Sequence, residues 1–356
     1  MHKILKQLIL LIVLFPALGF AKPSALLLNP GKRSESFWQD VDLFANAAAA
    51  RLELEFNIFH AERNNYLIIK EVERLIKNKQ LPDYLLLVNE KKILPKLLTL
   101  LEGQDVYVFV ILNGLPPQQR SKLLEKPHWQ KYLLTSLIPD NYWIGLQTAK
   151  GLIAAGNGQA GDVIMISGDK TTPASIERQA GAIDYFNSQP HIKLNHVVYA
   201  DWSQKVSYKK SLTLVGRVPK LKYIWTANDL MAFGSLDALG AHDLQAGEDV
   251  FISTINTSAK VLALKKAGKV STLGGGHFTA AGWALVLANQ HSKGKNLPKL
   301  VRDPLFQLIK PDTEFYRCLI TKNWDALPFE KITADAQGDY IFNMKAHQNS
   351  DKVNLK

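Results

Sequence analysis

Short apolar runs alternate with longer mixed segments along most of the chain. Residues 84–88 and 106–112 are apolar at nearly every position, which is typical of strands buried on both faces of a parallel sheet. Residues 37–54 and 175–187 have the length and mixed character of helices that cover such a sheet. After Asp140 the same rhythm starts again. The pattern predicts an α/β fold with two doubly wound parallel-sheet lobes.

The other predicted elements follow the same alternation. Further strands are expected at 24–29, 52–59, 163–166, 196–199, 223–226, 250–255 and 270–273. Further helices are expected from Asn64 or Asn65 to Lys77, and at 209–214, 231–239 and 259–267. Sheets of this kind bind ligands beyond the carboxyl ends of their strands, so the residues that follow each strand are the candidates for function.

The first residues have the three regions of a secretory signal peptide. Lys3 and Lys6 precede an unbroken apolar run at 8–15, and small residues, Gly19 and Ala21, stand at the spacing that a signal peptidase needs. A buried helix or a membrane anchor is the alternative, but the apolar run is short for a bilayer span. We therefore expect residues 1–21 to be removed after Ala21, the product to reach the periplasm in soluble form, and its formal charge to fall from +11 to +9.

Composition excludes several classes of protein. The chain has 356 residues, of which 47% are hydrophobic and 21% charged, as in an ordinary globular protein of two domains. Cys318 is the single cysteine, which excludes a disulfide scaffold and a cysteine-rich metal site. The excess lysines form small, separated groups, as on solvated helix faces, and there is no basic arm. Nucleic acid is therefore not an expected partner.

Local motifs do not indicate catalysis. The run Gly274-Gly275-Gly276-His277 lacks the spacing and the Lys-Ser/Thr of a phosphate loop. The sequence has neither an H-E-x-x-H nor a G-x-S-x-G motif, and its histidines are scattered. We expect no enzyme, no metal and no cofactor. An enzyme acting in the same cleft stays the competing hypothesis, because catalytic groups assemble from distant positions.

The residues after the strands combine aromatic rings with amides and an arginine. Rings stack on apolar faces, whereas amides and guanidinium groups supply paired donors and acceptors, a mixture that suits a sugar. The predicted ligand-binding residues are Phe37, Trp38, Asn89, Glu90, Asn113, Arg178, Trp202, Asn228, Asn256 and His277.

Each of these residues also has a purely structural interpretation. Phe37 and Trp38 are equally consistent with the first buried turn of a helix. Asn228 is at a position where it caps the next helix, and Asn89 and Asn113 are frequent turn residues. Arg178 is as consistent with a surface ion pair, and a histidine such as His277 is more often hydrogen-bonded within the fold than bound to a ligand.

Three segments resemble the type I periplasmic binding proteins, the class that contains the ribose- and galactose-binding proteins and the effector domain of the lac repressor. The strongest is Trp225-Thr-Ala-Asn-Asp-Leu-Met-Ala-Phe-Gly, and Ser175-Ile-Glu-Arg178 and Pro139-Asp-Asn141 support it. The Asn29-Pro-Gly and Gly274-Gly-Gly-His-Phe segments are similar to a sugar-type or sensory subgroup related to the autoinducer-2 receptor. The repressor branch is excluded because it begins with a helix-turn-helix.

The resemblance implies two lobes joined by three crossings, near 137–140, 273–275 and 305–311, with the ligand in the cleft. It implies an N-terminal lobe of 22–138 plus 275–306 and a C-terminal lobe of 139–274 plus 307–356. It implies stacking by Phe37 and Trp38 against Trp202, and polar contacts from Arg178 and Asn228. Many sugar binders have an aspartate where this chain has Asn256, which implies a less acidic cleft unless Glu90 points into it.

Together these features predict a monomeric, exported solute-binding protein. It would close on a sugar or sugar derivative and deliver this ligand to the permease of an ABC importer. The alternative is a receptor subunit that presents the bound solute to a membrane sensor, either a histidine kinase or a chemoreceptor.

Overall fold

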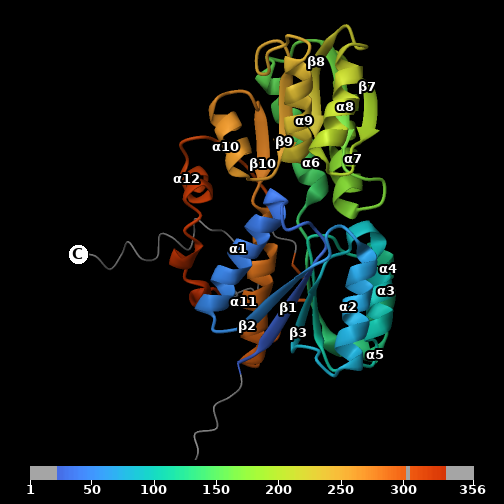
Figure 1. Ribbon diagram of the computed structural model, residues 1–356, viewed down its shortest axis with the longest axis vertical. Coiled ribbons are helices and arrows are strands. Elements are labelled where there is room, and N and C mark those ends of the chain that lie inside the picture. Colours follow the sequence, from blue (N-terminus) through green and yellow to red (C-terminus); the bar gives the residue numbers. More distant parts are fainter. Residues whose placement is uncertain (1–21, 302–304, 334–356) are drawn as a thin grey trace, which may run out of the picture.

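Two lobes, each built on a six-stranded sheet, make up the protein (Figure 1). The computed structural model describes residues 22–301 and 305–333. The predicted signal peptide, 1–21, lies outside the described residues. The strand orders are β11-β5-β4-β3-β1-β2 and β12-β10-β9-β8-β6-β7. Read from β2 and from β7, the first five strands of the two sheets follow the same order, so the lobes are structural repeats without a detectable sequence repeat.

The first lobe contains the N-terminal half of the chain and one later segment. Its strands are β1 (Ser24–Asn29), β2 (Glu55–His60), β3 (Tyr84–Leu87), β4 (Tyr107–Ile111), β5 (Leu133–Leu137) and β11 (Leu300–Val301). Its helices are α1 (Ser36–Arg51), α2 (Asn65–Lys77), α3 (Leu94–Leu101), α4 (Pro117–Leu124), α5 (Pro127–Tyr132) and α11 (Ala280–Ser292), with short 3₁₀ turns at Glu90–Lys92 and His277–Thr279.

The second lobe repeats the arrangement. Its strands are β6 (Gly161–Ser167), β7 (Ile192–Tyr199), β8 (Leu221–Thr226), β9 (Phe251–Ile255), β10 (Thr272–Gly275) and β12 (Gln307–Leu308). Its helices are α6 (Asn141–Ala155), α7 (Pro173–Asn187), α8 (Gln204–Val215), α9 (Asp229–Gly240) and α10 (Ala259–Lys266). All strand pairs are parallel except β10 with β12. The antiparallel edge strand β12 is therefore a departure from the wholly parallel sheets that the pattern predicts.

Unbroken apolar strands arise because both faces of each sheet are covered. On β3, Leu86 belongs to the core beneath α1 and α11, whereas Leu85 and Leu87 belong to the core beneath α2 and α3. Alternate residues of a strand point to opposite faces, so a strand covered on both sides is apolar throughout. The predicted strands are found within a few residues of their expected positions, as the apolar runs required.

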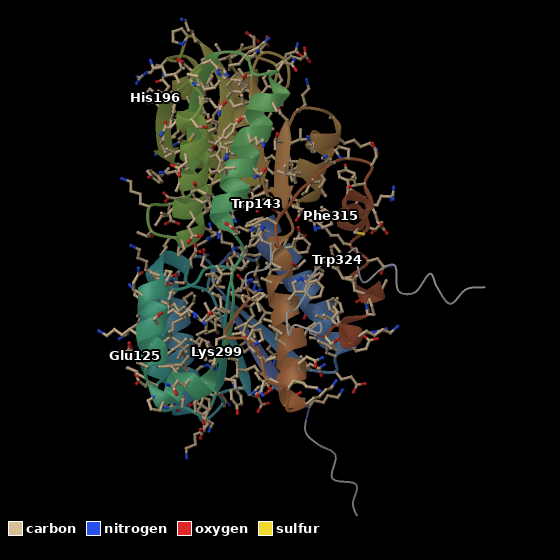
Figure 2. The ribbon with its side chains drawn as sticks, turned by 180° about the vertical axis from the view of Figure 1, so that it is seen from behind. Glu125, Trp143, His196, Lys299, Phe315 and Trp324 are labelled. Carbon is tan, nitrogen blue, oxygen red and sulfur yellow. The ribbon has the colours of Figure 1, made fainter. Side chains whose placement is uncertain are left out.

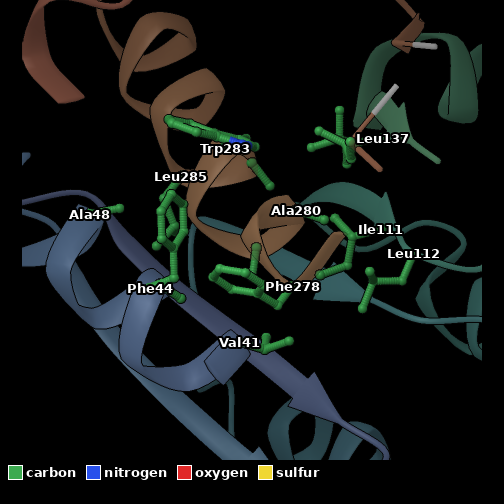
Figure 3. Close-up of a cluster of buried hydrophobic side chains, with 14 of the residues drawn as sticks. Val41, Phe44, Ala48, Ile111, Leu112, Leu137, Phe278, Ala280, Trp283 and Leu285 are labelled. Atoms are coloured by element: carbon green, nitrogen blue, oxygen red, sulfur yellow. The ribbon is translucent and has the colours of Figure 1, made fainter. Parts of the chain in front are cut away.

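Aromatic packing centres on Phe44 of α1. Its ring lies 5.0 Å from Trp283 and 5.7 Å from Phe278, both in steep edge-to-face geometry (Figure 3). Such pairs add about 0.5–1.5 kcal/mol beyond the burial of their area. They hold α1 against α11 and thereby fix the start of α1, where Phe37 and Trp38 lie.

The chain crosses between the lobes three times. The first crossing joins β5 to α6, the second joins β10 to α11, and the third joins β11 to β12. The second begins after β10, at Gly276, because 272–275 are themselves part of the second sheet. Gly276 has a φ of 112°, and a Cβ there would lie 2.5 Å from the carbonyl oxygen of Leu305. The second and third crossings therefore touch at a point where only glycine fits.

The C-terminal residues do not stay with one lobe. After β12, α12 (Glu314–Thr321) packs on α10 of the second lobe. The 3₁₀ turns η3 (Trp324–Ala326) and η4 (Phe329–Lys331) then pack on α1 of the first lobe. The resemblance assigned 307–356 wholly to the second lobe, and the described part of that segment departs from this expectation. Among the described residues, no helix combines the length and apolar character needed to cross a membrane.

Candidate functional site

A cavity of about 580 Å³ of empty space lies between the lobes and is partly open to solvent. It is lined by residues that follow strands of both sheets, as the strand-end rule predicts. All the predicted ligand-binding residues except Asn89 line it.

Asn89 has a structural role instead. Its Nδ2 donates to the carbonyl oxygen of Gly114 at 2.7 Å, and its Oδ1 accepts from the backbone N–H of Leu94 at 3.0 Å. These bonds fix the turn after β3, which is the alternative role that the sequence left open.

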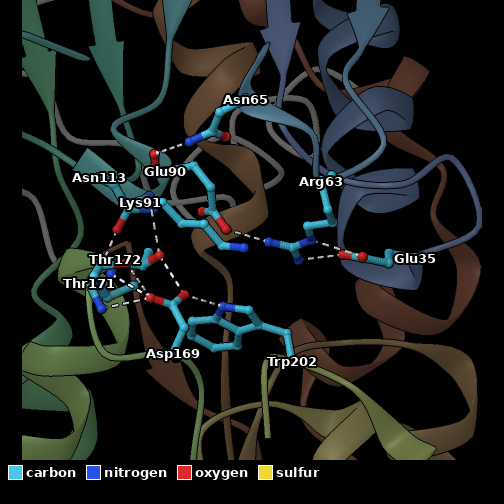
Figure 4. Close-up of polar contacts among 12 residues, drawn as sticks. Glu35, Arg63, Asn65, Glu90, Lys91, Asn113, Asp169, Thr171, Thr172 and Trp202 are labelled. Carbon is cyan, nitrogen blue, oxygen red and sulfur yellow. Dashed lines mark hydrogen bonds and ion pairs between the residues drawn. The ribbon is translucent and has the colours of Figure 1, made fainter. Parts of the chain in front are cut away.

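Arg63 organises the wall of the first lobe (Figure 4). Its guanidinium donates to Glu35 through Nε and Nη2 and to Glu90 through Nη1 at 2.5 Å. Burial opposes its charge, but Glu90 and Glu35 together raise the pKa of Arg63 above its ordinary value. One cation thus holds two carboxylates at the edge of the cavity. Arg63 is not among the predicted ligand-binding residues, although it lies just beyond β2 and satisfies the same strand-end rule.

Carboxylates from both lobes line the cavity, although Asn256 replaces an aspartate that many sugar binders have. Glu35, Glu90 and Asp229 all line it. Burial raises the pKa of Glu90, an effect that the charge of Arg63 opposes. Burial likewise raises the pKa of Asp229. The less acidic cleft was expected only if Glu90 points elsewhere, and Glu90 lines the cavity, so the exception to that expectation applies.

Asp229 and Asn256 form a buried pair. Asp229 Oδ1 accepts from Asn256 Nδ2 at 2.8 Å and from the backbone N–H of Leu230 at 2.9 Å, and Oδ2 accepts from Ser258. The carboxylate thus fixes the orientation of the Asn256 side-chain amide. Nδ2 of Asn256 donates to Asp229, and Oδ1 of Asn256 takes no part in that contact. Asn228 caps α9 by accepting from the N–H of Met231 at 2.9 Å, and it lines the cavity as well.

Among the residues that line the cavity, Arg178 supplies the positive charge of the second lobe. It is 4% exposed, and it donates to Asn141 Oδ1 at 2.9 Å, to the carbonyl oxygen of Ala227 at 3.0 Å and to His277 at 3.0 Å. Burial lowers the pKa of Arg178 to about 9, partly offset by Glu177. A Cβ on Gly145 would lie 2.0 Å from the carbonyl oxygen of Arg178, so this glycine allows α6 to approach α7 and bring Asn141 to the guanidinium.

His277 is a neutral partner of Arg178. Its ring lies between Phe37, at 4.5 Å, and Phe306, at 4.4 Å. Burial and the charge of Arg178 lower its pKa well below the ordinary value. An arginine can only donate, so His277 Nε2 accepts and the proton lies on Nδ1, which has no hydrogen-bond partner in the described part of the chain.

Aromatic rings from both lobes face the cavity. The rings of Phe37 and Trp38 pack edge to face, with their centroids 5.0 Å apart. The buried Nε1 of Trp38 has no hydrogen-bond partner among the described residues. Trp202, from the second lobe, donates from Nε1 to Asp169 Oδ2 at 2.8 Å (Figure 4). Asp169 does not line the cavity but fixes the indole that does.

Direct bonds join the lobes in a closed arrangement. Asn113 Oδ1 accepts from the backbone N–H of Ala174, in the first turn of α7, at 2.9 Å. The N–H of Lys91 donates to Thr172 Oγ1 at 3.3 Å. These bonds place the first-lobe loops directly against the start of the helix that carries Arg178.

Backbone strain is concentrated at this edge. Non-glycine residues with positive φ follow β2, β3, β4, β7 and β9, and those lining the cavity are Arg63, Leu112, Trp202 and Asn256. Each such conformation costs about 1–3 kcal/mol and typically occurs where function requires it. Within the described residues, no group of three or more His, Cys, Asp or Glu side chains is placed to hold a metal ion.

Comparisons with known proteins agree with this architecture. The model of the periplasmic binding protein domain matches residues 26–296. A periplasmic sugar-binding protein from Pseudomonas fluorescens has 29% identity and a TM-score of 0.80, covering 90% of this chain and 97% of that structure. An ABC transporter solute-binding protein from Actinobacillus succinogenes 130z with bound D-allose has 19% identity and a TM-score of 0.71, covering 83% of this chain and 99% of that one.

A curated relative is matched over a shorter stretch. The D-allose-binding periplasmic protein of Escherichia coli (strain K12) is 27% identical over 172 residues, 48% of this chain and 54% of that relative. The alignment thus spans about half the length of the relative. Because the family model matches most of its length and its fold has the same two lobes, the chain belongs to the periplasmic binding protein domain family, whose members bind solutes and are not enzymes.

Proposed function

We propose that the protein is an exported, monomeric solute-binding protein that encloses a sugar-like ligand and delivers it to an ABC importer. The observation that carries this proposal is the cavity between the lobes, in which aromatic rings stand beside carboxylates, guanidinium groups and amides. The names of the similar proteins, several of which are sugar-binding, support the same ligand class.

The chemistry of the two walls favours a neutral polyhydroxylated ligand. Glu90 and the side-chain oxygen of Asn256 are acceptors, whereas the guanidinium of Arg178 is a donor, and all three residues line the cavity. Among the described residues, Arg178 donates three of its five N–H groups to Asn141, Ala227 and His277. A hydroxyl both donates and accepts, so one ligand with several hydroxyls satisfies both kinds of group. We assign ligand contacts to Phe37, Trp38, Glu90, Asn113, Arg178, Trp202, Asn228, Asn256 and His277.

A thermal-shift screen of the chain from Lys22 onward tests the ligand class. Neutral aldoses such as D-allose, D-arabinose and D-galactose, in pyranose and furanose forms, should be compared with sugar acids and amino acids. A ligand at a hundred times its Kd stabilises the folded state by about 2.7 kcal/mol, which raises the melting temperature by several degrees. A shift with amino acids alone, or conversion of the sugar to a product, would contradict the proposal.

Two variants determine whether a shift arises from this cavity. Arg178→Met removes the guanidinium and should abolish the shift. Lys126→Met removes an exposed ion pair to Glu102 within the first lobe and should leave it unchanged. A shift that survives in Arg178→Met would place the ligand elsewhere.

Export is tested separately. We propose cleavage after Ala21 and delivery to the periplasm. N-terminal sequencing of the protein from a periplasmic fraction should read from Lys22, and a full-length protein retained in the cytoplasm would contradict this part of the proposal.

A further inference from the structure

The lobes are connected by more than the three crossings. Residues 310–333, which we call the C-terminal strap, begin on the second lobe and end on the first (Figure 1). The strap follows the region matched by the family model, which ends at residue 296.

The first half of the strap is anchored on the second lobe. Phe315 and Tyr316 of α12 are buried in a cluster with Val261 and Leu262 of α10. The hydroxyl of Tyr316 donates to the carbonyl oxygen of Leu262 at 3.1 Å. Figure 2 shows Phe315 at the level where the two lobes meet.

The second half is anchored on the first lobe. Trp324 and Phe329 lie 5.4 and 5.3 Å from the ring of Phe44 on α1, in edge-to-face geometry. Arg51 of α1 donates from Nε and Nη2 to the carboxylate of Glu330, both at 2.9 Å. One apolar cluster therefore runs without interruption from the first lobe through the strap to α10.

Asp40 lies between the two halves of the C-terminal strap and contacts both the strap and the second lobe. It belongs to α1 of the first lobe and is 3% exposed. Its Oδ2 accepts from the hydroxyl of Thr257, just beyond β9 of the second lobe, at 3.0 Å. Its Oδ1 accepts from Lys322, at the end of α12. Asp40 therefore joins α1 of the first lobe both to the second lobe and to the strap, so a motion that separates α1 from Thr257 breaks this junction.

We propose that the C-terminal strap is a fourth connection between the lobes, and that Asp40, bonded to Thr257 and Lys322, is the junction that biases the protein toward the closed state. Asp40 is thus a positioning residue that lies outside the ligand-lining set. Because the apparent affinity for any ligand scales with the fraction of protein that is competent to hold it, the junction also sets that affinity without touching the ligand.

The test measures the closed and open populations without added ligand, so it is independent of the proposed sugar. Dyes are placed on cysteines at two exposed positions, Lys77 of α2 and Lys209 of α8, after Cys318→Ser, and single-molecule energy transfer gives the two populations. Hydrogen bonds to charged groups shift such equilibria roughly tenfold or more. Lys322→Met and Thr257→Val should therefore each lower the closed-to-open ratio about tenfold, and Lys322→Arg should restore much of it.

Lys126→Met is the matched control, because it removes a lysine ion pair that lies within one lobe. Melting temperatures show whether each variant is folded, and Thr257→Val keeps the test valid if Lys322→Met does not fold. A closed-to-open ratio within twofold of the wild-type ratio in both Lys322→Met and Thr257→Val would overturn the proposal. The same holds where the wild type is found wholly open or wholly closed. An equal shift in Lys126→Met would overturn it too.

Discussion

Asp169 offers a quantitative test of how the second-lobe wall is built. Its carboxylate accepts from the backbone N–H groups of Thr171 and Thr172, from both of their hydroxyls, and from the indole of Trp202. Burial alone would raise the pKa, but the bonds from Thr172, Thr171 and Trp202 lower the pKa of Asp169 to about 2. The charged carboxylate is therefore strongly preferred in the folded protein.

Asp169→Asn removes that charge and replaces one acceptor oxygen by an N–H₂ donor. A pKa of about 2 in place of 3.8 corresponds to about 2 kcal/mol of stability at neutral pH. Since the folded pKa is lowered, this contribution is complete above about pH 4 and is lost as the pH falls toward 2. An added donor facing other donors increases the loss at neutral pH.

Urea denaturation of the wild type and of Asp169→Asn at pH 7, 5, 4 and 3 measures the effect. The difference in free energy of unfolding should be about 2–4 kcal/mol at pH 7 and should shrink below pH 4. Asp201→Asn, at an exposed carboxylate next to Trp202, serves as the control and should change little. A difference below about 0.5 kcal/mol at pH 7, or one that does not decrease in acid, would refute the reasoning.

Further variants test other parts of the structure. Burial raises the pKa of Asp42 to about 6, so the wild type loses stability as the pH rises from about 4 to 6. Asp42→Asn removes this loss but keeps an oxygen that can accept from Asn29, so its free energy of unfolding relative to the wild type should rise by about 1 kcal/mol or more between pH 4 and pH 8. A difference between the two proteins that does not change with pH would contradict this. Trp202→Ala should weaken binding of any sugar found in the screen by about 1–3 kcal/mol in titration calorimetry, whereas unchanged affinity with lower stability would assign the ring to the core alone. Gly276→Ala should lower the free energy of unfolding by about 1–3 kcal/mol or more, because φ is positive at this residue and the Leu305 carbonyl leaves no room for a Cβ. An unchanged melting temperature would exclude strain there.

The sheets could be predicted from sequence because their burial leaves a direct trace. A strand such as β3, covered on both faces, is apolar at every position, and no tertiary information is needed to recognise it. Helix α11 leaves no such trace by itself. It is buried all round, so it shows no amphipathic period, and the apolar pattern does not predict it.

The cavity could be predicted in outline but not in its charges. The strand-end rule placed Asn113 and Trp202 at the cavity, because position along a parallel strand determines which edge of the sheet a residue occupies. It did not reveal that Asp229 lies beside Asn256, since they belong to different elements and meet only through packing. The path of the C-terminal strap could not be predicted from the sequence for the same reason, because it depends on packing against the distant helices α10 and α1.

Helix α7 is completed by the opposite lobe. Its own N-cap residue, Thr172, makes no side-chain capping bond, and Asn113 from across the cleft supplies the acceptor for Ala174. When the lobes separate, this N–H returns to water and the first turn loses a cap, a change of about 1 kcal/mol. Amide exchange at Ala174 therefore reports the conformation of the whole protein from a single position. Arg178 lies one turn further along the same helix, so the turn that loses its cap adjoins a residue of the cavity.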